Sequence, residues 1–232
     1  MFKGIVLVLY LFRVMKARHH WQRDPGRRST MSGLTTAALR DGLTRIVRKL
    51  EDSEEELNSL DAALGDGDLG VSLTRGGRSL LAELPNLPDD DIGTALGNCA
   101  QAITRISGST CGTLFATGLL SVSKANKGRQ GIPWSEMSLM LATAIEGMSR
   151  RGNCRLGDKT VLDAIEAARS AIEGIQDPQA LIASADRAVA DAVEHYKHQP
   201  SRQGRARVAA DRSLGNADPG MVAFQRIIES LK

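Results

Sequence analysis

Apolar residues recur three and four positions apart along almost the whole chain from Met31 to Lys232, and this spacing places side chains on one face of an α-helix. Leu39, Leu43 and Leu50 show the pattern near the start of this region. No convincing strand pattern interrupts it. The sequence therefore predicts an all-α fold of eight helices without a sheet.

The helix boundaries follow from capping residues, glycines and prolines at the ends of each apolar pattern. The first helix is expected to begin near Thr35 or Thr36, and Asp158 is expected to cap the sixth. Pro178 and Pro219 occupy first-turn positions of the last two helices. The expected helices cover about 36–50, 71–84, 92–106, 113–125, 134–148, 159–172, 178–198 and 219–231.

Composition limits the class of protein. Hydrophobic residues make up 42% and charged residues 25% of the chain, which excludes wholesale disorder and a membrane protein with many spans. Aromatic residues are only 3%, so the core must be mainly aliphatic. The three cysteines form no C-x-x-C pair, and free thiols in a reducing cytoplasm are the simplest interpretation.

Residues 1–30 differ from the rest of the chain. They are strongly basic, whereas residues 31–232 carry a small excess of acidic groups, which gives no electrostatic case for binding nucleic acid. The apolar run at 4–12 is far shorter than the roughly 20 residues that a membrane span needs. We expect residues 1–30 to lie outside the fold, although a weak anchor stays an alternative, and residues 31–232 to form one domain.

The segment at 61–70 contains three carboxylates within eight residues, with glycines between them. Gly65 and Gly67 allow tight turns that can point Asp61, Asp66 and Asp68 at one place. Carboxylates so close together repel one another unless a cation lies among them. Mg²⁺ prefers such oxygen ligands and commonly bridges to phosphate. The alternative is a solvated Asp-Gly turn, and spacing alone leaves both interpretations open.

Three further loops are rich in glycine and polar residues. The loop at 108–112 precedes a predicted helix, whose first amides suit an anion. The loop at 152–160 is close to a Walker A motif, but the inserted Asp158 and the absence of a preceding strand pattern argue against a P-loop. The loop at 204–220 contains Arg205, which could pair with phosphate oxygens. Each loop could also be an ordinary connection.

Together these loops resemble one family, the nucleotide-binding L subunit of dihydroxyacetone kinases. The resemblance covers residues 33–232. It rests on L-D-x-x-x-G-D-G-D-x-G at 60–70, G-S-T-C-G-T-L-F at 108–115, R-G-x-x-x-x-G-D-K-T at 151–160 and G-R-A-R-x-x-x-x-R-S-L-G-x-x-D-P-G at 204–220. The family fold implies an antiparallel barrel or bundle of eight helices with the nucleotide at one end.

The resemblance also implies site residues. Asp61, Asp66 and Asp68 would hold two Mg²⁺ ions that bridge the phosphates of ADP or ATP. The implied nucleotide-binding residues are Leu69, Gly70, Val71, Ser72, Thr110, Cys111, Gly152, Val161, Arg205, Asp218, Pro219 and Gly220. Two positions depart from the family pattern, because Leu69 replaces the usual histidine and Ser72 replaces a frequent asparagine.

The implied activity is half of a kinase. In this family a separate K subunit or domain holds the ketose, and the L subunit supplies nucleotide and metal for phosphoryl transfer. The expected partners are therefore a K subunit and, in the phosphoprotein-dependent type, a phosphocarrier M subunit, and a homodimer stays open. A nucleotide-binding regulator without transfer activity is the alternative, and the departure at Leu69 is the feature that favours it.

Overall fold

The computed structural model describes residues 33–106, 110–204, 207 and 210–232. The expectations for residues 1–30, for residues 108–109 of the 108–112 loop and for Arg205 therefore lie outside the described residues.

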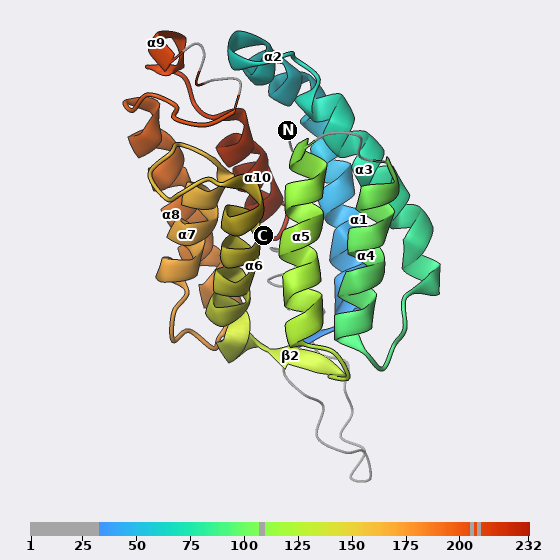
Figure 1. The fold of residues 1–232 in the computed structure, drawn as a ribbon. Coiled ribbons are helices and arrows are strands. Elements are labelled where there is room, and N and C mark those ends of the chain that lie inside the picture. The colour runs from blue at the N-terminus through green and yellow to red at the C-terminus, as the bar shows by residue number, and fades with distance from the viewer. Residues whose placement is uncertain (1–32, 107–109, 205–206, 208–209) are drawn as a thin grey trace.

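The described part of the chain is mainly helical, so the all-α class is confirmed (Figure 1). The long helices are α1 (Thr36–Asp52), α2 (Glu54–Leu64), α3 (Leu69–Glu83), α4 (Ile92–Ile106), α5 (Thr110–Ala125), α6 (Met137–Gly152), α7 (Val161–Ala171), α8 (Pro178–Lys197) and α10 (Pro219–Glu229). The shorter elements are β1 (Gly33–Thr35), η4 (Leu84–Asn86), β2 (Gly131–Pro133), η5 (Trp134–Glu136) and α9 (Ala210–Ser213).

The expectation of no sheet was wrong. β1 and β2 form an antiparallel pair in which Leu34 lies opposite Ile132. Each strand has only three residues, which is too short for an alternating pattern to appear in the sequence. The pair closes one end of the molecule, where a Cβ at Gly33 would lie 2.4 Å from the carbonyl oxygen of Ile132.

Two helices and one cap also differ from expectation. α2 and α9 were not predicted, and α2 escapes the helical pattern because only Leu57, Asp61 and Leu64 of its residues are buried. The cap of α7 is Thr160 rather than Asp158, because its hydroxyl accepts a hydrogen bond from the amide of Leu162. α2 matters most, since it carries the first carboxylate of the acidic loop.

The long helices pack in a closed series around an aliphatic core. Contacts run from α1 to α3 and then in order through α4, α5, α6, α7 and α8 to α10, and α10 packs back on α1. Leucine, isoleucine and alanine dominate the core, together with the fully buried Phe224 of α10. Within the described residues, no helix combines the length and the apolar character that crossing a membrane requires.

The two ends of this bundle are different. In Figure 1 the strand pair lies at one end, and α2 and α9 lie at the other. The starts of α3, α7 and α10 and the end of α6 are at the end with α2. The segments singled out in the sequence therefore converge on one end of the fold.

Candidate metal and nucleotide site

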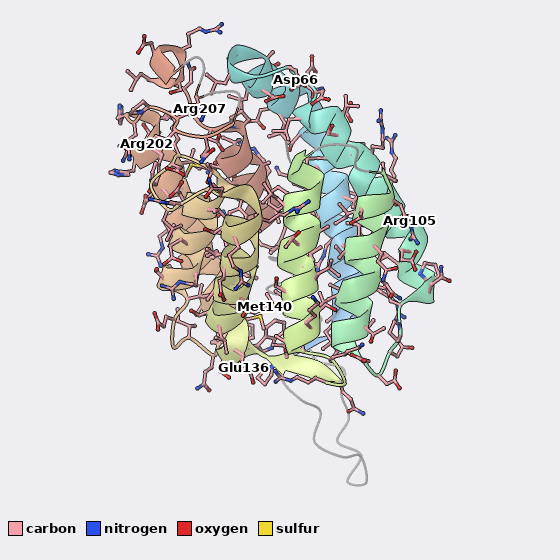
Figure 2. The ribbon with its side chains drawn as sticks, viewed as in Figure 1. Asp66, Arg105, Glu136, Met140, Arg202 and Arg207 are labelled. Atoms are coloured by element: carbon pink, nitrogen blue, oxygen red, sulfur yellow. The ribbon has the colours of Figure 1, made fainter. Side chains whose placement is uncertain are left out.

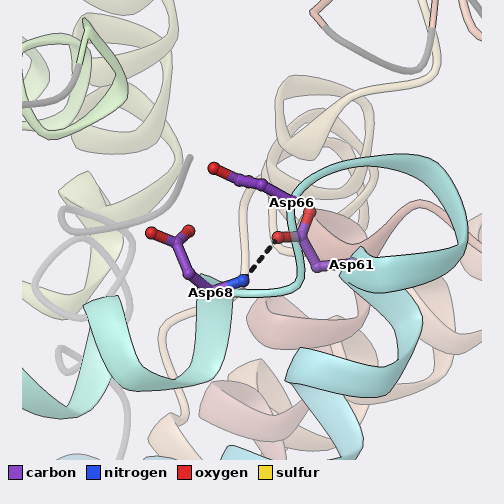
Figure 3. A group of neighbouring side chains, drawn as sticks. All are labelled: Asp61, Asp66 and Asp68. Carbon is purple, nitrogen blue, oxygen red and sulfur yellow. Dashed lines mark hydrogen bonds between the residues drawn. The ribbon is translucent and has the colours of Figure 1, made fainter.

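Three carboxylates gather where α2 passes into α3 (Figure 3). Asp61 lies in the last turn of α2, Asp66 in the connecting loop, and Asp68 at the cap position of α3. One oxygen of each lies within 4.8 Å of the others. Asp61 is buried, and Asp66 and Asp68 are exposed. An all-oxygen donor set with one buried and two exposed members fits a hard cation such as Mg²⁺ that also reaches a ligand from solvent.

Asp61 is the fixed member of the group. Its Oδ2 accepts a hydrogen bond of 3.1 Å from the amide of Asp68. Burial, followed by the negative charge of Asp66, raises the pKa of Asp61 above its ordinary value. A divalent cation would offset both effects, because it supplies positive charge at the point where the carboxylates meet.

The start of α3 is held against α2 by Asn58, a residue that the sequence analysis missed. The Asn58 Oδ1 accepts hydrogen bonds from the amides of Gly70 at 2.7 Å and Val71 at 3.2 Å. The backbones are also close, since a Cβ at Gly70 would lie 2.1 Å from the carbonyl oxygen of Glu54. No local pattern marks Asn58, because its partners lie twelve and thirteen residues later.

Gly70→Ala should cost at least about 2 kcal/mol of stability, because the new methyl group meets a backbone carbonyl that no rotamer change can move. The control is Gly97→Ala, whose Cβ would meet the Ser123 hydroxyl at 2.9 Å. That change should cost less, since a side chain can give way. Urea unfolding of both variants measures the difference, and equal losses would contradict the tight approach of α2 and α3.

Three chain segments meet at Lys159, in the loop before α7, at the same end of the bundle as the acidic loop. Its side chain is buried, and its Nζ donates to the carbonyl oxygens of Gln199 at 2.8 Å and Ser213 at 2.6 Å, with that of Lys197 at 3.5 Å. Burial lowers the pKa of Lys159, and the charge of Asp218 opposes this shift. Lys159 thus ties the loop before α7 to the segment between α8 and α10.

A second buried group, Asp163, orders the same loop. Its carboxylate accepts from the amides of Gly157 at 2.6 Å and Thr160 at 2.8 Å, and from the Tyr196 hydroxyl at 3.1 Å. Burial and the negative charge of Asp163 raise the pKa of Tyr196 to about 12. The loop at 152–160 is therefore fixed by α7 and α8, without the strand that a P-loop requires.

Asp218 caps α10. Its Oδ1 accepts hydrogen bonds from the amides of Gly220 at 3.0 Å and Met221 at 2.9 Å. Burial raises the pKa of Asp218 to about 7, against the lowering effect of these bonds and of the Lys159 charge. Pro219 and Gly220 form the buried first turn of α10. Asp218 thus has a structural use as a helix cap.

The remaining predicted residues lie at helix ends. Thr110 and Cys111 begin α5, Gly152 ends α6, and the buried Val161 begins α7. Figure 2 shows Asp66, Arg202 and Arg207 at this end of the molecule and Glu136 at the opposite end.

The first residues of α3 differ in exposure. Leu69 is completely buried in the core, so its side chain packs inside the bundle and does not face a ligand. Val71 is exposed and Ser72 is half-buried.

Comparison with known proteins identifies the family. The DAK2 domain family matches residues 63–232, which include Asp66, Asp68 and the three later motifs. The chain therefore belongs to the DAK2 domain family. The match covers most of the described helices, from the end of α2 to α10.

Curated relatives are kinases or kinase subunits. The ADP-binding subunit DhaL of the PEP-dependent dihydroxyacetone kinase of Escherichia coli (strain K12) is 30% identical over 203 residues, which are 85% of this chain and 96% of that protein. The L-erythrulose 1-kinase of Mycolicibacterium smegmatis is 32% identical over 184 residues. This match covers 78% of the chain but only 32% of that enzyme.

A solved structure has the same fold. The dihydroxyacetone kinase of C. freundii in complex with AMP-PNP and Mg²⁺ superposes with a TM-score of 0.68 at 22% identity. The superposition covers 92% of this chain and 37% of that one. The chain thus spans about a third of the single-chain kinases and nearly the full length of the E. coli subunit.

Proposed function

We propose that the chain is the ADP- or ATP-binding subunit of a dihydroxyacetone kinase or related ketose kinase, which acts in the cytoplasm with a separate K subunit that holds the ketose. One observation carries the proposal: the carboxylates of Asp61, Asp66 and Asp68 converge in a chain that matches almost the whole length of an ADP-binding subunit. A phosphocarrier M subunit would recharge bound ADP, and ATP would replace it in an ATP-dependent system.

In this proposal Asp61, Asp66 and Asp68 hold two Mg²⁺ ions, which neutralise charge on the phosphates. The buried Asp61 anchors the set, and the exposed Asp66 and Asp68 face the incoming nucleotide. The proposed nucleotide contacts are Leu69, Gly70, Val71, Ser72, Thr110, Cys111, Gly152, Val161, Arg205, Asp218, Pro219 and Gly220. Because the side chain of Leu69 and the amides of Gly70 and Val71 are already engaged, these three contribute mainly by shaping the start of α3.

A second candidate function is a nucleotide-binding regulator without transfer activity. The observation that favours it is the buried, apolar Leu69 at a position where a histidine would offer a polar group near the phosphates. Both functions require the same metal and nucleotide, so binding alone does not separate them.

Mass spectrometry of the purified chain should detect ADP or ATP in a one-to-one complex that EDTA dissociates. Reconstitution with the K subunit of the same organism then separates the two functions. With dihydroxyacetone as the acceptor, and with ATP or with phosphoenolpyruvate and the phosphocarrier proteins as the phosphoryl donor, the mixture should form dihydroxyacetone phosphate, and omission of this chain should abolish the product. Nucleotide binding without transfer would identify a regulator, and a lack of nucleotide binding would reject both functions.

A further inference from the structure

We propose that Asn58 is a positioning residue that caps α3 in place of Asp68 and thereby leaves the Asp68 carboxylate available for the metal. The inference rests on the proposed function, because it concerns the affinity of the same site for the Mg²⁺ nucleotide.

The first turn of α3 is capped by a side chain from another helix and not by the residue at its own cap position. Asp68 is the residue before the first turn, and an aspartate there ordinarily accepts from the amides two and three positions later. The Asp68 side chain makes no such bond. The two amides that it would take, those of Gly70 and Val71, donate instead to Asn58 Oδ1 at 2.7 Å and 3.2 Å.

The same molecule contains aspartates that cap their own helices. The Asp218 Oδ1 accepts from the amides of Gly220 and Met221, which hold the same positions in α10 as Gly70 and Val71 hold in α3. Asp177 likewise accepts from the amide of Ala180 at the start of α8. Asp177 and Asp218 have the extended backbone of an ordinary cap, with ψ of 122° and 125°. Asp68 has ψ of 8°, so α3 departs from self-capping in the backbone as well as in the side chain.

The missing self-cap of α3 affects how the Asp68 carboxylate lies relative to Asp61 and Asp66. A carboxylate that caps its own helix is turned toward the helix amides, whereas the Asp68 carboxylate has an oxygen within 4.8 Å of oxygens of Asp61 and Asp66. Asn58 lies one turn before Asp61 on α2, and the Asp68 amide donates to Asp61 Oδ2. α2 therefore both caps α3 and sets the separation of Asp61 from Asp68.

The arrangement also determines what α3 can offer a nucleotide. Free amides at a helix start attract phosphate. Here Asn58 occupies those of Gly70 and Val71, and the amide of Ser72 donates to the Asp68 carbonyl oxygen at 2.9 Å. α3 thus contributes through the orientation of Asp68 rather than through its own amides.

Asn58→Leu tests the proposal, because leucine keeps the size of the side chain and removes the acceptor. The amides of Gly70 and Val71 then lack an acceptor, so we expect the Asp68 backbone to turn from ψ 8° to the extended conformation in which its carboxylate caps them, and capping and metal binding compete. Titration calorimetry with Mg²⁺ and ADP should show a loss of affinity of roughly 10-fold to 100-fold, as for other residues that orient metal ligands. The free energy of unfolding in urea should change little, because self-capping replaces the lost cap.

Two variants separate this role from a purely structural one. Asn58→Asp keeps an acceptor oxygen and adds a negative charge near the three carboxylates, so its affinity for Mg²⁺ and ADP should not fall below that of the wild type. Asn126→Leu is the matched control, since Asn126 is buried near the strand pair and bonds Val122 and Arg129. It should lower stability and leave nucleotide affinity unchanged. Wild-type affinity in Asn58→Leu, or an equal loss in Asn58→Asp, would overturn the proposal.

A double-mutant cycle tests the route through Asp68. If Asn58 acts by releasing that carboxylate, Asn58→Leu should have little further effect on affinity in an Asp68→Asn background. Additive losses would show that Asn58 acts by another route and would overturn the proposal. If the wild-type protein fails to bind Mg²⁺ and ADP, the proposed function itself is rejected. If the wild type binds them and Asn58→Leu binds them equally well, only this inference is rejected.

Discussion

Asp66→Asn and Asp68→Asn should each weaken the binding of Mg²⁺ and ADP by more than about 100-fold, since even the loss of a residue that only orients a metal ligand costs about 10-fold to 100-fold. The metal-free protein should be as stable as the wild type or slightly more stable. Its carboxylates lie close enough to repel one another, and either change removes one negative charge while keeping the shape of the side chain.

Calorimetry and urea unfolding measure the two effects in the same variants. Asp90→Asn is the control, because it removes an exposed carboxylate from the loop before α4, at the end of the molecule with the strand pair. It should change neither property. Wild-type affinity in both Asp66→Asn and Asp68→Asn would show that the loop is a solvated turn, and the kinase proposal would fall with it.

The pH dependence of metal binding has a definite sign. A protonated carboxyl group cannot bind Mg²⁺ as a carboxylate does, and burial together with the charge of Asp66 raises the pKa of Asp61. The wild type should therefore bind Mg²⁺ with its full affinity at pH values above this raised pKa, and the affinity should fall as the pH is lowered through it. Asp66→Asn removes one of the two causes and should move the midpoint to lower pH.

Lys159→Met should lower the free energy of unfolding by roughly 2–5 kcal/mol, because it leaves one buried and one partly buried carbonyl oxygen without their charged donor. The Lys159 Nζ donates to the carbonyls of Gln199 and Ser213, which lie 40 and 54 residues later in the chain. The loss should appear in urea unfolding as a lower midpoint with an unchanged slope.

Hydrogen exchange locates the effect of this change. The amide of Ser201 donates to the Ser213 hydroxyl and that of Arg202 to the Asp158 carbonyl, so both should exchange faster when the Lys159 bonds are lost. Lys49→Met is the control, since Lys49 makes a partly exposed ion pair with Glu229 at 3.5 Å and should cost less than about 1 kcal/mol. Similar losses in both variants would contradict the role of Lys159.

The helices that the sequence predicted correctly are those with a broad apolar face. α1 buries Leu39, Leu43, Ile46 and Leu50 at helical spacing, and the predicted and observed helices agree closely there. α2 was missed because three successive glutamates open it and few of its residues are buried. Its helical state depends on packing against α3 and α10, which no local pattern records.

The sequence by itself determined the all-α class and the acidic loop, because both depend on residues that are near one another in the chain. Helical periodicity repeats within a few positions, and Asp61, Asp66 and Asp68 are brought together by one short turn. Only the tertiary structure decided how the site is held. Asn58 meets the amides of α3 through the packing of α2, and Lys159 meets carbonyls of a segment beyond α8. These partners are distant in sequence, so their pairing follows from the folded arrangement of whole helices.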